Sequence, residues 1–147
     1  MNHKPRVLFF STGDSTRSQM AEGFLREFAG DEVIPVSTAV RSPQPDLLAV
    51  EVMNEVGVDI SAQRAKDVAE SLKEHFSCVV TVCDASKERF PVWPFTRNIF
   101  HWSLLDPETV EGSMEQRREV FRRVRDEIKA KVREFATQTL VDLHAGS

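Results

Sequence analysis

The sequence predicts an α/β fold with a four-stranded, mostly parallel sheet in the order 2-1-3-4 and helices on both faces. Short apolar runs, typical of buried strands, alternate along the chain with segments whose apolar residues recur every three or four positions. This alternation is typical of a parallel sheet covered by helices. The chain has 147 residues, 41% of them hydrophobic, which is enough for one core. We therefore expect a single domain spanning residues 1–147.

Four segments have strand character and four have helix character. The expected strands are residues 7–10, 33–36, 78–83 and 99–102. The expected helices are residues 17–28, residues 46–56 with Asp46 as cap and Gly57 as stop, a weaker helix within 61–74, and a long helix that opens at Ser113 and runs to Phe135. Pro35 interrupts the second strand, which we therefore expect near a sheet edge.

Composition and charge narrow the functional classes. The net charge of −4 argues against nucleic acid as the main partner. The two cysteines, Cys78 and Cys83, cannot build a disulfide framework or a four-cysteine zinc site. Their odd spacing places them on opposite faces of one strand, so we expect them to pack rather than pair. The apolar run at 7–10 is too short for a signal peptide or membrane span, so we expect a cytoplasmic protein without a membrane partner.

The most informative segment is the loop between the first strand and the first helix, which we call the oxyanion loop. Its residues are Ser11, Thr12, Gly13, Asp14, Ser15, Thr16, Arg17 and Ser18. Backbone N–H groups of such a turn point inward, and the helix N-terminus adds partial positive charge. Arg17 can donate two hydrogen bonds to one oxyanion, for which phosphate, arsenate and sulfate are candidates. The alternative is a plain capped helix start, with Ser15 or Thr16 as cap.

Residues 7–23 resemble the phosphate loop of low-molecular-weight protein tyrosine phosphatases and, more closely, of their arsenate reductase relatives. The family pattern is a cysteine, five residues, Arg-Ser or Arg-Thr, and a Met-Ala-Glu helix, and the spacing from Ser11 to Arg17 matches it. Further similar segments are residues 49–61, 79–94, 101–108 and 121–128. The resemblance implies the low-molecular-weight phosphatase fold, no cofactor, an anion in the oxyanion loop, and a thioredoxin-like or phosphoprotein partner.

The resemblance also assigns roles to individual residues. Ser11 stands at the position of the nucleophilic cysteine, Arg17 at that of the oxyanion-binding arginine and Asp106 at that of the general acid. Cys83 matches the first of two further cysteines in the thioredoxin-linked reductases, whereas Phe90 stands where the second is expected. Thr16 replaces a cysteine that many of the reductases have.

Two departures from the family pattern affect the chemistry. A serine hydroxyl stays protonated where a cysteine would be a thiolate, and it cannot form the sulfur–sulfur bond that arsenate reduction requires. Asp14 stands where the family usually has asparagine, and its carboxylate would repel a bound anion unless it turns outward or a cation or proton compensates. The reductases can hold potassium near this loop, which by resemblance suggests a cation site of Asp14, Glu22 and Ser37.

The sequence therefore leaves three functions open. We expect an oxyanion-binding family member whose catalysis is absent or very weak because of Ser11 and Phe90. The second possibility is an active arsenate reductase or phosphotyrosine phosphatase in which Ser11 is an introduced substitution. The third is a non-catalytic interaction module with an empty loop.

Overall fold

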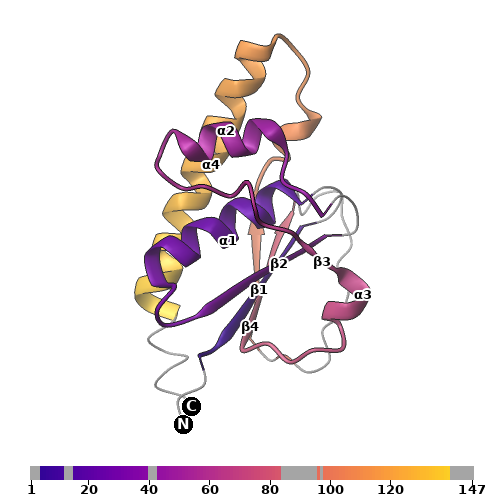
Figure 1. Ribbon diagram of the computed structural model, residues 1–147, viewed down its shortest axis with the longest axis vertical. Helices are drawn as coiled ribbons and strands as arrows, with labels where there is room; N and C mark the ends of the chain where they lie inside the picture. The colour runs from indigo at the N-terminus through magenta and orange to yellow at the C-terminus, as the bar shows by residue number, and fades with distance from the viewer. Residues whose placement is uncertain (1–3, 12–14, 40–42, 84–95, 97, 140–147) are drawn as a thin grey trace.

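The centre of the protein is a five-stranded parallel sheet in the order β3-β2-β1-β4-β5 (Figure 1). The computed structural model describes residues 4–11, 15–39, 43–83, 96 and 98–139. The strands are β1 (Arg6–Ser11), β2 (Ile34–Ala39), β3 (Lys66–Asp67), β4 (Cys78–Cys83) and β5 (Ile99–Ser103). The α/β class and the relative order of the four expected strands are confirmed.

The predicted strand count was wrong by one, because β3 was not expected. Lys66 and Asp67 pair in parallel with Thr38 and Ala39 at the outer side of β2. Two polar residues carry no hydrophobic period, so no sequence pattern marks this strand. The two-residue strand forms because the chain passes beside β2 and its backbone completes the ladder there.

Pro35 lies in the part of β2 that pairs with a neighbouring strand on one side. Val7 of β1 lies opposite Pro35 in the register, so β2 pairs along its whole length with β1. On its other side β2 pairs only at its last two residues, with β3. Since proline cannot donate a backbone hydrogen bond, the strand tolerates Pro35 where it needs no second ladder. The expected place near an edge is confirmed.

Helices cover the two faces of the sheet unequally (Figure 1). On one face lie α1 (Thr16–Ala29), α2 (Leu47–Asn54) and α4 (Met114–Glu134). Their apolar residues form the main core with the β1 and β4 side chains of that face, among them Phe9 and Val80. The opposite face carries a smaller cluster that includes Leu8, Phe10 and Phe76, with α3 (Val68–Ser71) beside it.

Helix ends largely follow the sequence signals. The Asp46 carboxylate accepts a hydrogen bond from the Leu48 N–H at 2.8 Å and caps α2, and Gly57 has a φ of 80° after that helix ends. Ser113 and Gln116 form a reciprocal capping box at the start of α4. The weak helix expected within 61–74 is limited to the four residues of α3, capped by Asp67. Beyond α4 the chain continues as a π-helical turn, Phe135–Thr139.

None of the helices in the described part of the chain is long and apolar enough to span a membrane.

Helix α1 crosses the segment after α2 at a glycine. A Cβ atom built on Gly23 would lie 2.6 Å from Ile60 Cγ2 and 3.3 Å from Val58 Cγ1. Ile60 is completely buried, so its methyl group has little room to move. The absent side chain at position 23 therefore sets how closely α1 approaches residues 58–63.

We expect Gly23→Ala to destabilise the protein by about 1–3 kcal/mol, the usual cost of overpacking a filled core. This is opposite in sign to the gain of roughly 1 kcal/mol that alanine gives over glycine inside an exposed helix. Urea unfolding of the wild type and the variant measures the difference. A variant as stable as the wild type would show that Ile60 and its neighbours adjust without cost.

Ion pairs join α4 to the end of α2. Glu55, the residue after α2, accepts hydrogen bonds from Arg122 Nη2 at 2.7 Å and from Arg125 Nη1 at 2.8 Å. Arg125 Nη1 also donates to the backbone oxygen of Val52 at 2.9 Å. The hydrogen bonds from Arg122, followed by the one from Arg125, lower the pKa of Glu55 from 4.5 to about 2.

This low pKa predicts an acid-sensitive contact. Folded Glu55 binds its proton less tightly than unfolded Glu55, so its contribution is complete above 4.5 and disappears as pH falls toward about 2. Glu55→Gln should lower the melting temperature near neutral pH, and the difference from wild type should shrink on acidification through that range. Glu127→Gln, at an exposed position of α4, is the matched control. A difference independent of pH would contradict the assignment.

Candidate functional site

The carboxyl ends of three neighbouring strands meet at one edge of the sheet. Ser11 is the last residue of β1, Cys83 of β4 and Ser103 of β5. Phe10 lies opposite Thr81 in the parallel register, so the ends of β1 and β4 are adjacent. The strand ends thus meet as expected, whereas residues 12–14 and 84–95 of the loops that follow β1 and β4 lie outside the described residues. In such sheets ligands bind beyond the carboxyl ends of the strands.

The two ends of the oxyanion loop are joined by serine hydroxyls. Ser11 Oγ donates to Ser18 Oγ at 2.9 Å, and Ser18 Oγ donates to the Ser15 backbone oxygen at 3.0 Å. All three serines are buried. Thr12, Gly13 and Asp14 lie outside the described residues. This hydrogen bond directs the proton of the Ser11 hydroxyl at the oxygen of another hydroxyl.

Helix α1 begins inside the oxyanion loop. Ser15 occupies the N-cap position of α1, but the Ser15 side chain forms no capping hydrogen bond. The alternative of a plain helix start capped by Ser15 is therefore wrong. The adjacent Thr16 is buried, and its Oγ1 has no hydrogen-bond partner among the described residues. Buried polar atoms without a protein partner are uncommon and call for an explanation such as a ligand.

The Arg17 side chain is almost completely buried, with 1% of it exposed. Its Nη1 donates to the Leu104 backbone oxygen at 3.1 Å, and its Nη2 lies 3.6 Å from Asp106 Oδ2. The guanidinium therefore connects the start of α1 to the segment after β5. A buried positive charge at a helix N-terminus produces a strongly anion-selective environment.

Asp106 faces Arg17 from a short 3-10 helix, Pro107–Thr109, that it caps. Its Oδ1 accepts a hydrogen bond from the Glu108 N–H at 3.0 Å, while Oδ2 is the oxygen beside Arg17. One-fifth of the Asp106 side chain is exposed. This carboxyl group thus lies at the rim of the site, where it can reach both Arg17 and solvent.

The two cysteines differ in how far the structure describes them. Cys78 is fully buried, and burial raises its pKa to about 12. Its expected role in packing is confirmed, because Cys78 belongs to the main core. The backbone of Cys83 ends β4 beside the oxyanion loop, but its side chain is not described, and Phe90 lies outside the described residues. The redox role implied for Cys83 stays a prediction.

Two of the three residues of the suggested cation site meet. Ser37 Oγ donates to Glu22 Oε1 at 2.7 Å, and Arg26 Nη2 donates to Glu22 Oε2 at 2.6 Å. The third, Asp14, lies outside the described residues. Both oxygens of the buried Glu22 carboxylate thus accept a hydrogen bond from the chain itself, and the suggested cation site stays a prediction. The described residues contain no cluster of three or more histidine, cysteine or acidic side chains that could hold a metal.

The sequence did not single out three polar residues that lie near the oxyanion loop. Gln19, Arg26 and Gln63 connect α1 to the segment after α2 through side-chain hydrogen bonds. Glutamine and arginine on a helix surface are common, so residue type and spacing give no signal for this contact. Only the crossing at Gly23 brings position 63 beside position 19.

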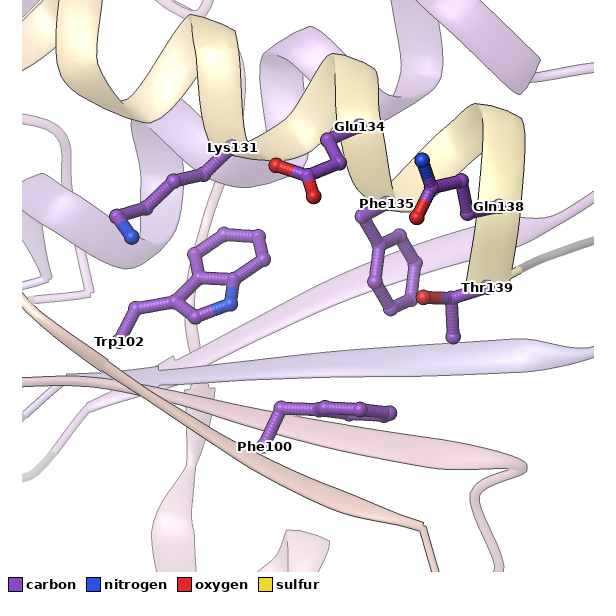
Figure 2. Close-up of a pocket in the computed structure, with 7 residues that line it drawn as sticks. All are labelled: Phe100, Trp102, Lys131, Glu134, Phe135, Gln138 and Thr139. Atoms are coloured by element: carbon purple, nitrogen blue, oxygen red, sulfur yellow. The ribbon is translucent and has the colours of Figure 1, made fainter.

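A cleft lies away from the predicted site residues. Phe100 and Trp102 of β5 and Phe135 form the walls of a cleft of about 310 Å³ (Figure 2). Both β5 rings meet Phe135 edge to face, with centroids 6.2 Å apart. The cleft contains none of the residues predicted to bind an anion.

Comparison with known proteins identifies the class. The sequence profile of the low molecular weight phosphotyrosine protein phosphatases matches residues 6–143. The chain belongs to this family. Within it, the chain resembles proteins named arsenate reductase. That of Shouchella clausii is 40% identical over 133 residues, which are 90% of this chain and 96% of the relative. That of Halalkalibacterium halodurans is 37% identical over 134 residues, 91% and 96% of the two chains.

Solved structures agree with this placement. A structure described as an arsenate reductase in the phosphate binding state superposes with a TM-score of 0.75 and 29% identity, covering 91% of this chain and 98% of the other. The family resemblance and the low-molecular-weight phosphatase fold expected from the sequence are thus confirmed.

Proposed function

We propose that this protein binds a tetrahedral oxyanion, phosphate or arsenate, in the oxyanion loop, and that Ser11 leaves it with little or no catalysis of its own. The observation that carries the proposal is the buried Arg17 guanidinium at the N-terminus of α1, held by Leu104 and Asp106. Arg17 cannot be deprotonated in a protein. A dianion beside Arg17 is stabilised by a charge-assisted hydrogen bond and by the partial positive charge of the helix N-terminus.

Two further observations support the anion. The buried hydroxyl of Thr16 has no acceptor or donor among the described residues, and a bound oxyanion is a ligand that can hydrogen-bond a hydroxyl. A structural relative is described in a phosphate binding state. The Asp106 carboxylate lies close enough to Arg17 to balance part of the guanidinium charge, so a bound anion competes with this ion pair.

The proposed loss of catalysis follows from the chemistry at Ser11. In this environment a cysteine is a thiolate, because the helix N-terminus and Arg17 lower its pKa. A serine hydroxyl has a far higher pKa and needs a neighbouring base, and its hydrogen bond goes to Ser18. Sulfur is also required for the disulfide steps of arsenate reduction.

The second candidate is an enzyme, either arsenate reductase or phosphotyrosine phosphatase, of which this chain is a Ser11 form. The relatives named arsenate reductase favour it. A thioredoxin-like partner would belong to this function and a phosphoprotein partner to either. The third candidate, an interaction module with an empty loop, predicts no anion binding at all.

The first test is calorimetric titration of the wild type with phosphate, arsenate and sulfate. Arg17→Ala should abolish phosphate binding, because the charge and both donors are lost. Arg17→Lys keeps the charge but not the planar pair of donors, and should bind at least about tenfold more weakly than wild type, as expected for a lost charge-assisted hydrogen bond of roughly 1.5 kcal/mol or more. Circular dichroism verifies that each variant is folded. Equal affinity in all three proteins would place the site elsewhere.

The second test restores sulfur. Ser11→Cys should hydrolyse an aryl phosphate slowly: the thiolate attacks phosphorus, Asp106 protonates the leaving oxygen, and water then releases phosphate. The double variant Ser11→Cys, Asp106→Asn is the control, and should be slower by about 10²–10⁴-fold, the usual contribution of a general acid. Clear phosphatase activity in the unmodified protein would refute the claim that Ser11 disables catalysis.

A further inference from the structure

A relay of side-chain hydrogen bonds reaches the oxyanion loop from the segment after α2. Arg26 Nη1 donates to Gln63 Oε1 at 2.7 Å, and Gln63 Nε2 donates to Gln19 Oε1 at 3.0 Å and to the Gln19 backbone oxygen at 2.9 Å. Gln19 Nε2 then donates to Ser15 Oγ at 3.2 Å and to the Pro43 backbone oxygen at 2.9 Å. The relay therefore ends on the residue where the loop joins α1.

Elementary donor and acceptor rules fix the direction of every step. An arginine can only donate, so the atom of Gln63 that faces Arg26 must be its carbonyl oxygen. Its NH₂ group then faces Gln19, whose side-chain oxygen must be the acceptor. The NH₂ group of Gln19 is left for Ser15 and Pro43, and both of its hydrogens are used. Neither glutamine can turn its amide over without losing these bonds.

The relay is anchored at its far end by buried charge. Arg26 is held by Glu22, which is 5% exposed and also accepts a hydrogen bond from Ser37 of β2. A carboxylate with two donors in a buried position has one favourable geometry, so the Arg26 side chain is held in place although half of it is exposed. The relay thus links the sheet, helix α1 and the segment after α2.

Ser15 is held at several atoms by this arrangement. Its Oγ accepts from Gln19 Nε2, and its backbone oxygen accepts from Ser18 Oγ at 3.0 Å and from the Gln19 N–H at 2.8 Å. Ser15 lies directly before the first turn of α1, whose N–H groups are the donors available to an anion. A small rotation at Ser15 would therefore change the direction of those donors.

We propose that Gln63 is a positioning residue for the oxyanion loop, acting through the side chain of Gln19 on Ser15. Gln63 itself does not touch the anion, and it lies 44 positions along the chain from Gln19. The inference rests on the proposed function, because its readout is anion affinity. A purely structural Gln63 would instead fasten residues 58–63 to α1 and influence only stability.

The test compares Gln63→Met, which is uncharged and similar in length, with wild type in titrations with inorganic phosphate. The variant should bind phosphate about five- to tenfold more weakly, within the range measured for residues coupled in one network. Gln63→Glu can still accept from Arg26 but cannot donate to Gln19, so it should also bind more weakly. Gln138→Met, at an exposed position of the π-helical turn, is the matched control and should bind as wild type does.

A double-mutant cycle tests the route. If Gln63 acts through Gln19, Gln19→Met should weaken phosphate binding by a similar factor. The loss of phosphate affinity in the double variant should then be no greater than the larger of the two single losses. Phosphate affinity within twofold of wild type in both Gln63→Met and Gln63→Glu would overturn the proposal. It would also be overturned if the fold-losses of the two single variants multiplied in the double variant. Absence of phosphate binding in the wild type would refute the proposed function itself, a result that is distinct from both.

Discussion

The burial of the Arg17 guanidinium is the constraint on which the site depends. A charge that is 99% removed from solvent must have acceptors around it, and arginine cannot escape by losing its proton. Leu104 supplies a carbonyl and Asp106 a carboxylate, both from the chain beyond β5. Arg17 thereby fixes the start of α1 to the segment after β5, and the proposed anion site lies beside the same guanidinium.

The rest of the fold brings the other parts of the site to the same edge. Because all strand pairings are parallel, Ser11, Cys83 and Ser103 end on one side of the sheet. The close crossing at Gly23 brings Gln63 to α1, where the relay through Gln19 reaches Ser15. The start of α1 is thus held through Arg17 and through Gln19.

The same framework separates binding from reaction. Anion binding needs backbone N–H groups, a helix N-terminus and a guanidinium, none of which depends on the atom at the end of residue 11. Attack on phosphorus or arsenic depends on that atom, because sulfur ionises in this electrostatic environment whereas a serine oxygen does not. This separation is the basis of the function proposed for the chain, in which Ser11 permits anion binding without catalysis.

The sequence by itself determined the fold class, the order of the four main strands, the capped ends of α2 and α4, and the family. Periodicity and capping residues act over a few positions, and the motif around Arg17 is contiguous, so local sequence suffices for them. Only the tertiary structure decided the strand at Lys66–Asp67, the contact of Arg17 with Leu104 and the relay through Gln63. These depend on which distant backbone passes nearby, and common residue types such as glutamine carry no mark of the partner they will meet.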